Sequence, residues 1–179
     1  MSQVSYIAQP AARTTLDAIE DIAKASDLAN LDIAAAYVTS SGVYDLLKRI
    51  NTVLGADWAV VKKRWITSFD YCRTQPVALE TLLSLPASSV RIYDASFCLT
   101  HAGMPRIPFH PKAFLFRGKD EDFALAGSGN LSRSGLSKGV EVGLTLAVDR
   151  KQPDGTYTSA FSVPVVVKKG IVRGRFGGE

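Results

Sequence analysis

A histidine and a lysine two residues apart precede a small-residue run that is rich in hydrogen-bond donors. The first group is His110-Pro111-Lys112 and the second is Gly127-Ser128-Gly129-Asn130. Imidazole is a nucleophile and a base, lysine brings a positive charge, and the hydroxyl and carboxamide donate hydrogen bonds. Fixed donors of this kind stabilise the charge that builds on phosphoryl oxygens during attack. The residue types therefore predict a phosphodiesterase site.

Two short apolar runs, residues 113–116 and 123–126, carry these groups and are separated by charged, turn-forming residues. This pattern predicts a β-hairpin. Side chains two apart on a strand share a face, so His110 and Lys112 should project together while Pro111 faces away. The second strand then delivers Ser128 and Asn130 to the same place.

A lone carboxylate, Glu141, interrupts the apolar run of residues 140–146. A carboxylate in such surroundings needs a partner. We interpret Glu141 as the acceptor for a histidine Nδ1, which would fix the tautomer of the ring. The alternative is a carboxylate on an edge strand that faces water.

Four further residues are predicted to touch the substrate. Small residues let the backbone approach an anion closely, which points to Gly127 and Gly129. Positive charge close to the motif points to Arg133 and Lys138 as contacts for phosphates beside the scissile one.

The order His-x-Lys, Gly-Ser-x-Asn and then a glutamate resembles the signature of the phospholipase D superfamily. The resemblance covers about a quarter of the chain, residues 109–146, and the run Gly-Ser-Gly-Asn-Leu-Ser-Arg-Ser-Gly-Leu is most similar to the bacterial nuclease and restriction-enzyme branch. It implies cleavage without a metal or cofactor, through a covalent phosphohistidine. His110 would be nucleophile or acid, phosphate would be bound by Lys112, Ser128 and Asn130, and Glu141 would orient the histidine.

The sequence departs from this pattern in two ways. The family places an Asp five residues after the lysine, where this chain has Arg117. Family enzymes also use two motifs, one histidine attacking and the other protonating the leaving oxygen, whereas this chain has only His110 and His101. His101 lacks the motif and reads as a surface residue. We therefore expect a homodimer whose active site lies on the two-fold axis.

Apolar periodicity outside the motif predicts alternating helices and strands. Two helices should begin at Thr14 or Thr15 and at Ser40 or Ser41, and a third helix should span residues 77–85. Strands are expected at 31–38, 64–69 and 90–93. Such alternation predicts an α/β fold with a mixed, largely parallel sheet flanked by helices, in line with a phospholipase D-like sandwich. We assign residues 1–148 to this domain. Residues 149–179 form a basic extension, read as an extra hairpin, a dimer arm or a linker stub.

The charge and the cysteines give weaker indications. The net charge is +4 and the isoelectric point is about 9.1, which favours a polyanionic partner such as DNA. The run 62–65 (Lys-Lys-Arg-Trp) either touches a nucleic-acid backbone or is the charged entry to a strand, and the second reading is preferred. No signal peptide or membrane span is evident, so we expect a cytoplasmic protein with reduced cysteines. A zinc site from Cys72, Cys98, His101 and His110 is a minor alternative.

The preferred function is a DNA nuclease with loose sequence preference, serving restriction, repair or defence against foreign DNA. One alternative is a non-catalytic phosphate- or nucleic-acid-binding module of a larger restriction or defence system, with the missing activity in another domain or subunit. A lipid phosphodiesterase is a weaker reading, because the chain shows no amphipathic membrane-binding segment.

Overall fold

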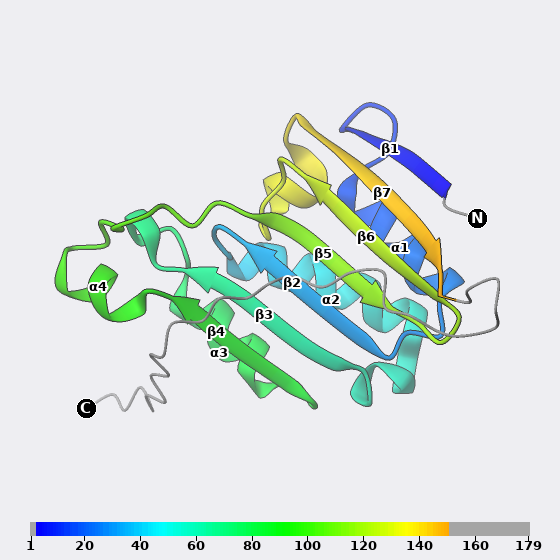
Figure 1. Cartoon of the computed structure of the whole chain (residues 1–179), viewed down its shortest axis with the longest axis horizontal. Helices are drawn as coiled ribbons and strands as arrows, with labels where there is room; N and C mark the ends of the chain where they lie inside the picture. Colours follow the sequence, from blue (N-terminus) through cyan, green and yellow to red (C-terminus); the bar gives the residue numbers. More distant parts are fainter. Residues whose placement is uncertain (1–2, 151–179) are drawn as a thin grey trace.

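The computed structural model describes residues 3–150, which form one seven-stranded sheet covered by helices (Figure 1). Across the sheet the strands run in the order β1-β7-β6-β5-β2-β3-β4. Their bounds are β1 Gln3–Gln9, β2 Asn30–Ala35, β3 Lys62–Ser68, β4 Ser88–Tyr93, β5 Lys112–Arg117, β6 Glu121–Gly127 and β7 Glu141–Asp149.

The sheet is mixed, as predicted. Parallel pairing is confined to β2 with β3 and β3 with β4. The pairs β1–β7, β2–β5, β5–β6 and β6–β7 are antiparallel, so the sheet is less parallel than expected. The reason is that the hairpin β5–β6 pairs directly with β2, and the chain then adds β7 and β1 on the same side.

Strand β1 was not predicted, because only Ile7 of its inward side chains is strongly apolar. Ile7 is fully buried, while the inward Ser5 instead shares a hydrogen bond with Thr145 of β7. Outward residues Val4 and Tyr6 are more than 60% exposed. The large apolar side chains of β1 therefore occupy both faces, unlike those of a strand that has water on its outer face.

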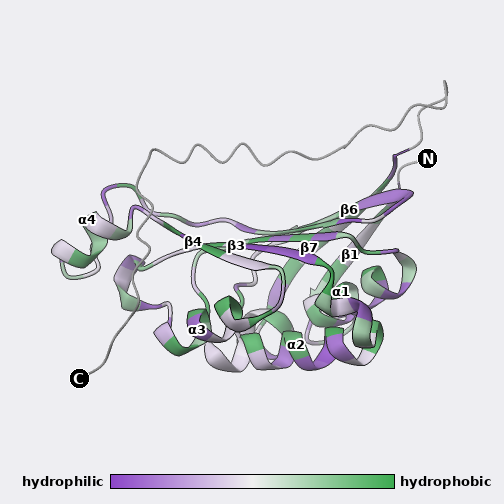
Figure 2. Cartoon of the chain, turned by 90° about the horizontal axis from the view of Figure 1, so that it is seen from below, coloured by the Kyte–Doolittle hydropathy of each residue, from purple (hydrophilic) through white to green (hydrophobic). Residues whose placement is uncertain are grey.

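The three long helices cover one face of the sheet (Figure 2). They are α1 Thr15–Ala25, α2 Ser40–Leu54 and α3 Pro76–Ser84; short helices are η1 Gly55–Ala59, η2 Asp70–Cys72, α4 Ala95–Thr100 and the π-helix η3 Ser134–Lys138. Thr14 caps α1 in a reciprocal capping box with Asp17, and Thr39, one residue before the predicted start, caps α2.

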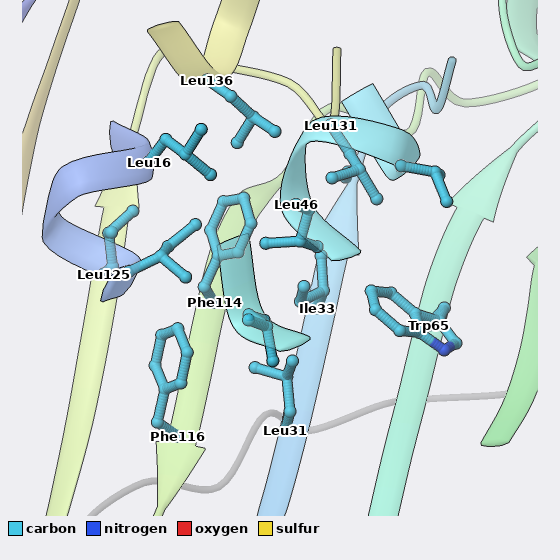
Figure 3. Close-up of a cluster of buried hydrophobic side chains, with 14 of the residues drawn as sticks. Leu16, Leu31, Ile33, Leu46, Trp65, Phe114, Phe116, Leu125, Leu131 and Leu136 are labelled. Atoms are coloured by element: carbon cyan, nitrogen blue, oxygen red, sulfur yellow. The ribbon is translucent and has the colours of Figure 1, made fainter. Parts of the chain in front are cut away.

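The core lies between these helices and the sheet (Figure 3). Phe114 and Phe116 of β5 are fully buried beside Leu31 and Ile33 of β2. From the helix side and the loop after β6 they meet other buried leucines, namely Leu16, Leu46, Leu131 and Leu136. This layer fixes β5 and β6, whose ends carry the predicted motif.

The basic run 62–65 is divided between the two faces of β3. Lys63 and Trp65 are buried, and the Lys63 ammonium donates to the carbonyls of Trp58, Val61 and Pro86 at 2.5, 2.7 and 2.9 Å. Burial lowers the pKa of Lys63. The preferred reading of a charged strand entry with a core tryptophan thus holds for these two residues, but Lys62 and Arg64 are exposed on the opposite face.

We call the sheet face opposite α1–α3 the open face, because no helix of residues 3–150 lies across it (Figure 2). Its β1 and β7 side carries exposed apolar residues, and its β2, β3, β4 and β5 side carries charged ones. Arg117, at the position where the family pattern has Asp, donates from Nη1 to Asp32 Oδ2 at 2.6 Å on this face.

None of the helices in the described residues is long and apolar enough to cross a bilayer. The predicted boundary after residue 148 falls close to the end of β7 at Asp149, and Arg150 follows. The remainder of the basic extension, residues 151–179, lies outside the described part of the chain.

Candidate active site

His110 and Lys112 lie together at the start of β5, as their spacing predicts. The Lys112 ammonium is 2.8 Å from His110 Nδ1 and 3.0 Å from the His110 carbonyl oxygen, to which it donates. His110 itself precedes the strand, which begins at Lys112. Because an ammonium can only donate, the ring nitrogen that it contacts presents a lone pair.

The segment that leads to His110 is held by a buried carboxylate, which sequence reasoning missed. Asp70 is 6% exposed, and its Oδ2 accepts a hydrogen bond from the Phe109 backbone N–H at 2.7 Å. The Phe109 ring stacks on Tyr93, with 5.2 Å between centroids. A signal was present, because Asp70 is a carboxylate that directly follows the strand predicted at residues 64–69.

The Gly-Ser-Gly-Asn run follows β6 and reaches the same end of the sheet. Ala113 of β5 pairs with Ala126 of β6, so Lys112 and Gly127 are the next residues on adjacent strands. A Cβ on Gly127 would lie 2.4 Å from the Val142 carbonyl oxygen, and one on Gly129 would lie 2.2 Å from that of Gly135. The predicted glycines thus allow close approach of protein backbone to backbone.

Ser128 and Glu141 contact each other across β6 and β7. The Ser128 hydroxyl donates to Glu141 Oε2, and the Val142 N–H donates to Ser128 Oγ at 3.1 Å. The carboxylate was expected to accept from the histidine ring instead. In the structure its hydrogen-bonded partner is the serine, because the register of β6 and β7 places Ser128 next to the start of β7.

The carboxylate also lies close enough to affect the lysine electrostatically. Burial lowers the pKa of Lys112, and the negative charge of Glu141 opposes this by raising it. The charged form of a partly buried ammonium is stabilised when an anion binds beside it and replaces the solvent lost on burial. Lys112 therefore stands between its histidine and the Ser128–Glu141 pair as the cationic centre of this region.

Asn130 is buried and faces the start of α2. Its Oδ1 accepts a hydrogen bond from the Tyr37 backbone N–H at 3.3 Å, and it is 7% exposed. Since the amide oxygen is used in this way, the NH₂ group is the part that remains to donate. Tyr37 was not predicted, because its contribution is a backbone N–H and carries no side-chain signal.

The two predicted flanking cations differ in their surroundings. Arg133 makes a two-pronged ion pair with Asp45 of α2, at 2.8 and 3.1 Å, and this raises the pKa of the arginine. Lys138 is exposed at the end of η3. Asp45 was missed as the partner of Arg133, since 88 residues separate them in sequence.

His101 lies outside this group. Its ring is exposed, stacks on Phe97 with 3.7 Å between centroids, and contacts the Thr100 hydroxyl at 2.9 Å. Cys98 is buried with its thiol 3.6 Å from Asp70 Oδ1, and burial is the main reason that its pKa rises to about 11. Within residues 3–150 no three His, Cys, Asp or Glu side chains are arranged to hold a metal, so the zinc alternative has no geometric support.

Comparison with solved structures identifies the fold. NucT from Helicobacter pylori superposes with a TM-score of 0.57 at 18% identity, covering 82% of this chain and 86% of that one. A phospholipase D family member, Nuc from Salmonella typhimurium, gives 0.53 at 11% identity, covering 83% and 84%. No family model and no curated protein matches the sequence. The chain thus has the phospholipase D-like fold that its motif predicted.

Proposed function

We propose that this protein is a metal-independent nuclease that cleaves DNA phosphodiesters through His110. The observation that carries the proposal is the pairing of His110 with Lys112, next to the Ser128–Glu141 pair, at the end of a phospholipase D-like sheet. A nucleophile, a cation and hydrogen-bond donors are thereby concentrated where neighbouring strands end. A net charge of +4 favours a polyanionic substrate.

The chemistry requires two histidines. The lone pair of one His110 forms a bond to phosphorus while the bond to the leaving oxygen breaks, and that oxygen takes a proton from a second histidine. Water then attacks phosphorus, gives its proton to the second histidine and releases the first. Lys112 and the Asn130 amide stabilise the non-bridging oxygens in both steps, and Ser128 joins them when its hydroxyl turns its one proton from Glu141 to the phosphate.

A second copy of this chain is the natural source of the other histidine, because His101 lies elsewhere. Exposed apolar residues support such an association: Val4 and Tyr6 of β1 and Val142 and Leu144 of β7 on the open face, and Val140 just before β7. Apolar patches of this kind mark interaction sites. We call this set the apolar patch and propose that it contributes to a two-fold homodimer.

Substrate comparison in excess EDTA tests the proposal. We expect cleavage of plasmid or single-stranded DNA and no release of headgroup from phosphatidylcholine vesicles. Cleavage of the lipid alone would replace the nuclease by a lipid phosphodiesterase. DNA binding without cleavage of either substrate would favour a binding module that acts with another subunit.

A further inference from the structure

Two adjoining hollows on the open face are lined by basic side chains. Their volumes are about 330 and about 510 Å³, and both include Arg64 and Arg117 in their walls. Arg91 lines the first and Lys62 the second. We call these four residues the basic strip; it runs across β3, β4 and β5.

The basic strip has more positive charges than there are carboxylates beside it. Asp32 accepts from Arg64 Nε and Nη2, both at 2.5 Å, and from Arg117 Nη1. Asp122 lies beside Arg117 in the β5–β6 register and is fully buried. Lys62 and Arg91 are exposed, and neither forms an ion pair with another residue of 3–150. Four cations therefore face two carboxylates.

The arrangement suits a linear chain of phosphates. Lys62 and Arg64 share a face of β3, so their positions are about 6.6 Å apart along the strand. Guanidinium groups match phosphate oxygens with parallel hydrogen bonds. Between the cations the floor of the first hollow is apolar and includes Ala34, Ile66, Ala113 and Leu115.

Of the strip's cations, Arg91 lies nearest to the end of the sheet that carries the candidate site, in one cross-strand row with Ile66, Ala34 and Ala113. Lys62 and Arg117 lie toward the opposite end, and the Lys112 side chain points to the helix-covered face. Ala113, in the floor of the first hollow, directly follows Lys112 in the chain, and Ala34 pairs with Ala113 across β2 and β5. A polymer held at Lys112 thus reaches the strip by passing over the end of the sheet onto the open face. A small phosphate ester would not span this path.

We propose that the basic strip binds the nucleic-acid backbone beyond the scissile phosphate. The identity of the polyanion rests on the proposed nuclease function, whereas the location of the binding surface rests on Lys62, Arg64, Arg91 and Arg117. An acidic protein segment would be a different occupant of the same charges. The nucleic acid is favoured because the cations recur along β3 and approach, through Arg91, the end of the sheet that carries the site.

Binding of a fluorescein-labelled single-stranded oligonucleotide, followed by anisotropy across a salt series, tests this proposal in the full-length His110→Ala protein. Arg91→Ala and Lys62→Ala remove exposed, unpaired cations of the strip. Lys48→Ala removes the same charge from the exposed surface of α2, on the other side of the sheet. Each strip variant should weaken binding severalfold and reduce the salt slope by about one. The Lys48 variant should match its parent.

Equal binding by the strip and Lys48 variants would overturn the proposal, as would binding of an acidic peptide but not of the oligonucleotide. Cleavage is scored separately with the same substitutions in the wild-type background. Loss of binding in the strip variants supports the strip even if wild type fails to cleave, a result that would remove only the nuclease function. Wild-type cleavage together with strip variants that neither bind more weakly nor cleave more slowly would remove the strip and leave the nuclease.

Discussion

The two faces of the sheet differ in what their side chains do. The face under α1–α3 is mostly apolar, although Gln9, Thr67 and Thr145 are also buried there, and its buried ammonium, Lys63, has three carbonyl partners. The open face combines the apolar patch with the basic strip. The first face stabilises the fold by excluding water, whereas the second exposes apolar and basic side chains that can bind a partner molecule. The candidate site lies at the end of the sheet where the two faces meet.

The largest predicted contrast is in stability. Phe114→Ala should lower the free energy of unfolding by about 3–5 kcal/mol, because the ring is fully buried among large side chains. Arg91→Ala on the open face should change it by no more than about 0.5 kcal/mol. Urea denaturation at one fixed protein concentration measures both. Similar values for the two variants would contradict the division between the faces.

A charged substitution in the apolar patch tests its role in the dimer without disturbing the core. Leu144→Asp places one carboxylate in each half of a two-fold interface, so the homodimer should dissociate and cleavage should fall with it. Val60→Asp, at a residue 77% exposed but outside the patch, is the matched control. Light scattering reports the mass. A Leu144→Asp protein that remains dimeric would show that the patch is not the interface.

The glycine run offers a steric test at the end of the sheet. Gly129→Ala brings a methyl group against the Gly135 backbone, so we expect a stability loss of about 1–3 kcal/mol and displacement of Asn130. Cleavage should fall even at temperatures where circular dichroism shows that the variant is folded. Full activity in the folded variant would mean that the position of Asn130 does not matter.

The smallest predicted effect is a shift in pH dependence. Burial lowers the pKa of Lys112, so its ammonium loses its proton at a lower pH than that of an exposed lysine. Cleavage should decline accordingly as pH rises. Lys112→Arg keeps its charge throughout this range and should move the decline to higher pH, whatever its overall rate. Identical alkaline limbs for the two proteins would exclude Lys112 as the titrating group.

Local patterns were enough to predict most of the elements, including α1 with its Thr14 cap and the hairpin β5–β6. They could not predict β1, because most of its apolar side chains point to the open face rather than into the core. The share of antiparallel pairing was also underestimated. Sequence alternation suggests βαβ units, but it does not reveal that β5 inserts beside β2.

At the site, the grouping of His110 with Lys112 follows from their two-residue spacing. The partners of the remaining groups depend on long-range register. Glu141 meets Ser128 because β6 and β7 pair at that point, and Asn130 meets a backbone N–H of Tyr37. Asp70 holds the backbone before His110 from a distant loop. Contacts between segments so far apart leave little trace in a single sequence.

The most direct test of the account is DNA cleavage in excess EDTA by wild type and His110→Ala, with His101→Ala as the matched histidine control. All three proteins should have the same mass by light scattering. The account predicts cleavage by wild type and His101→Ala, and a loss of at least about a thousandfold in His110→Ala, since the attacking group is removed. Undiminished cleavage by dimeric His110→Ala would contradict it.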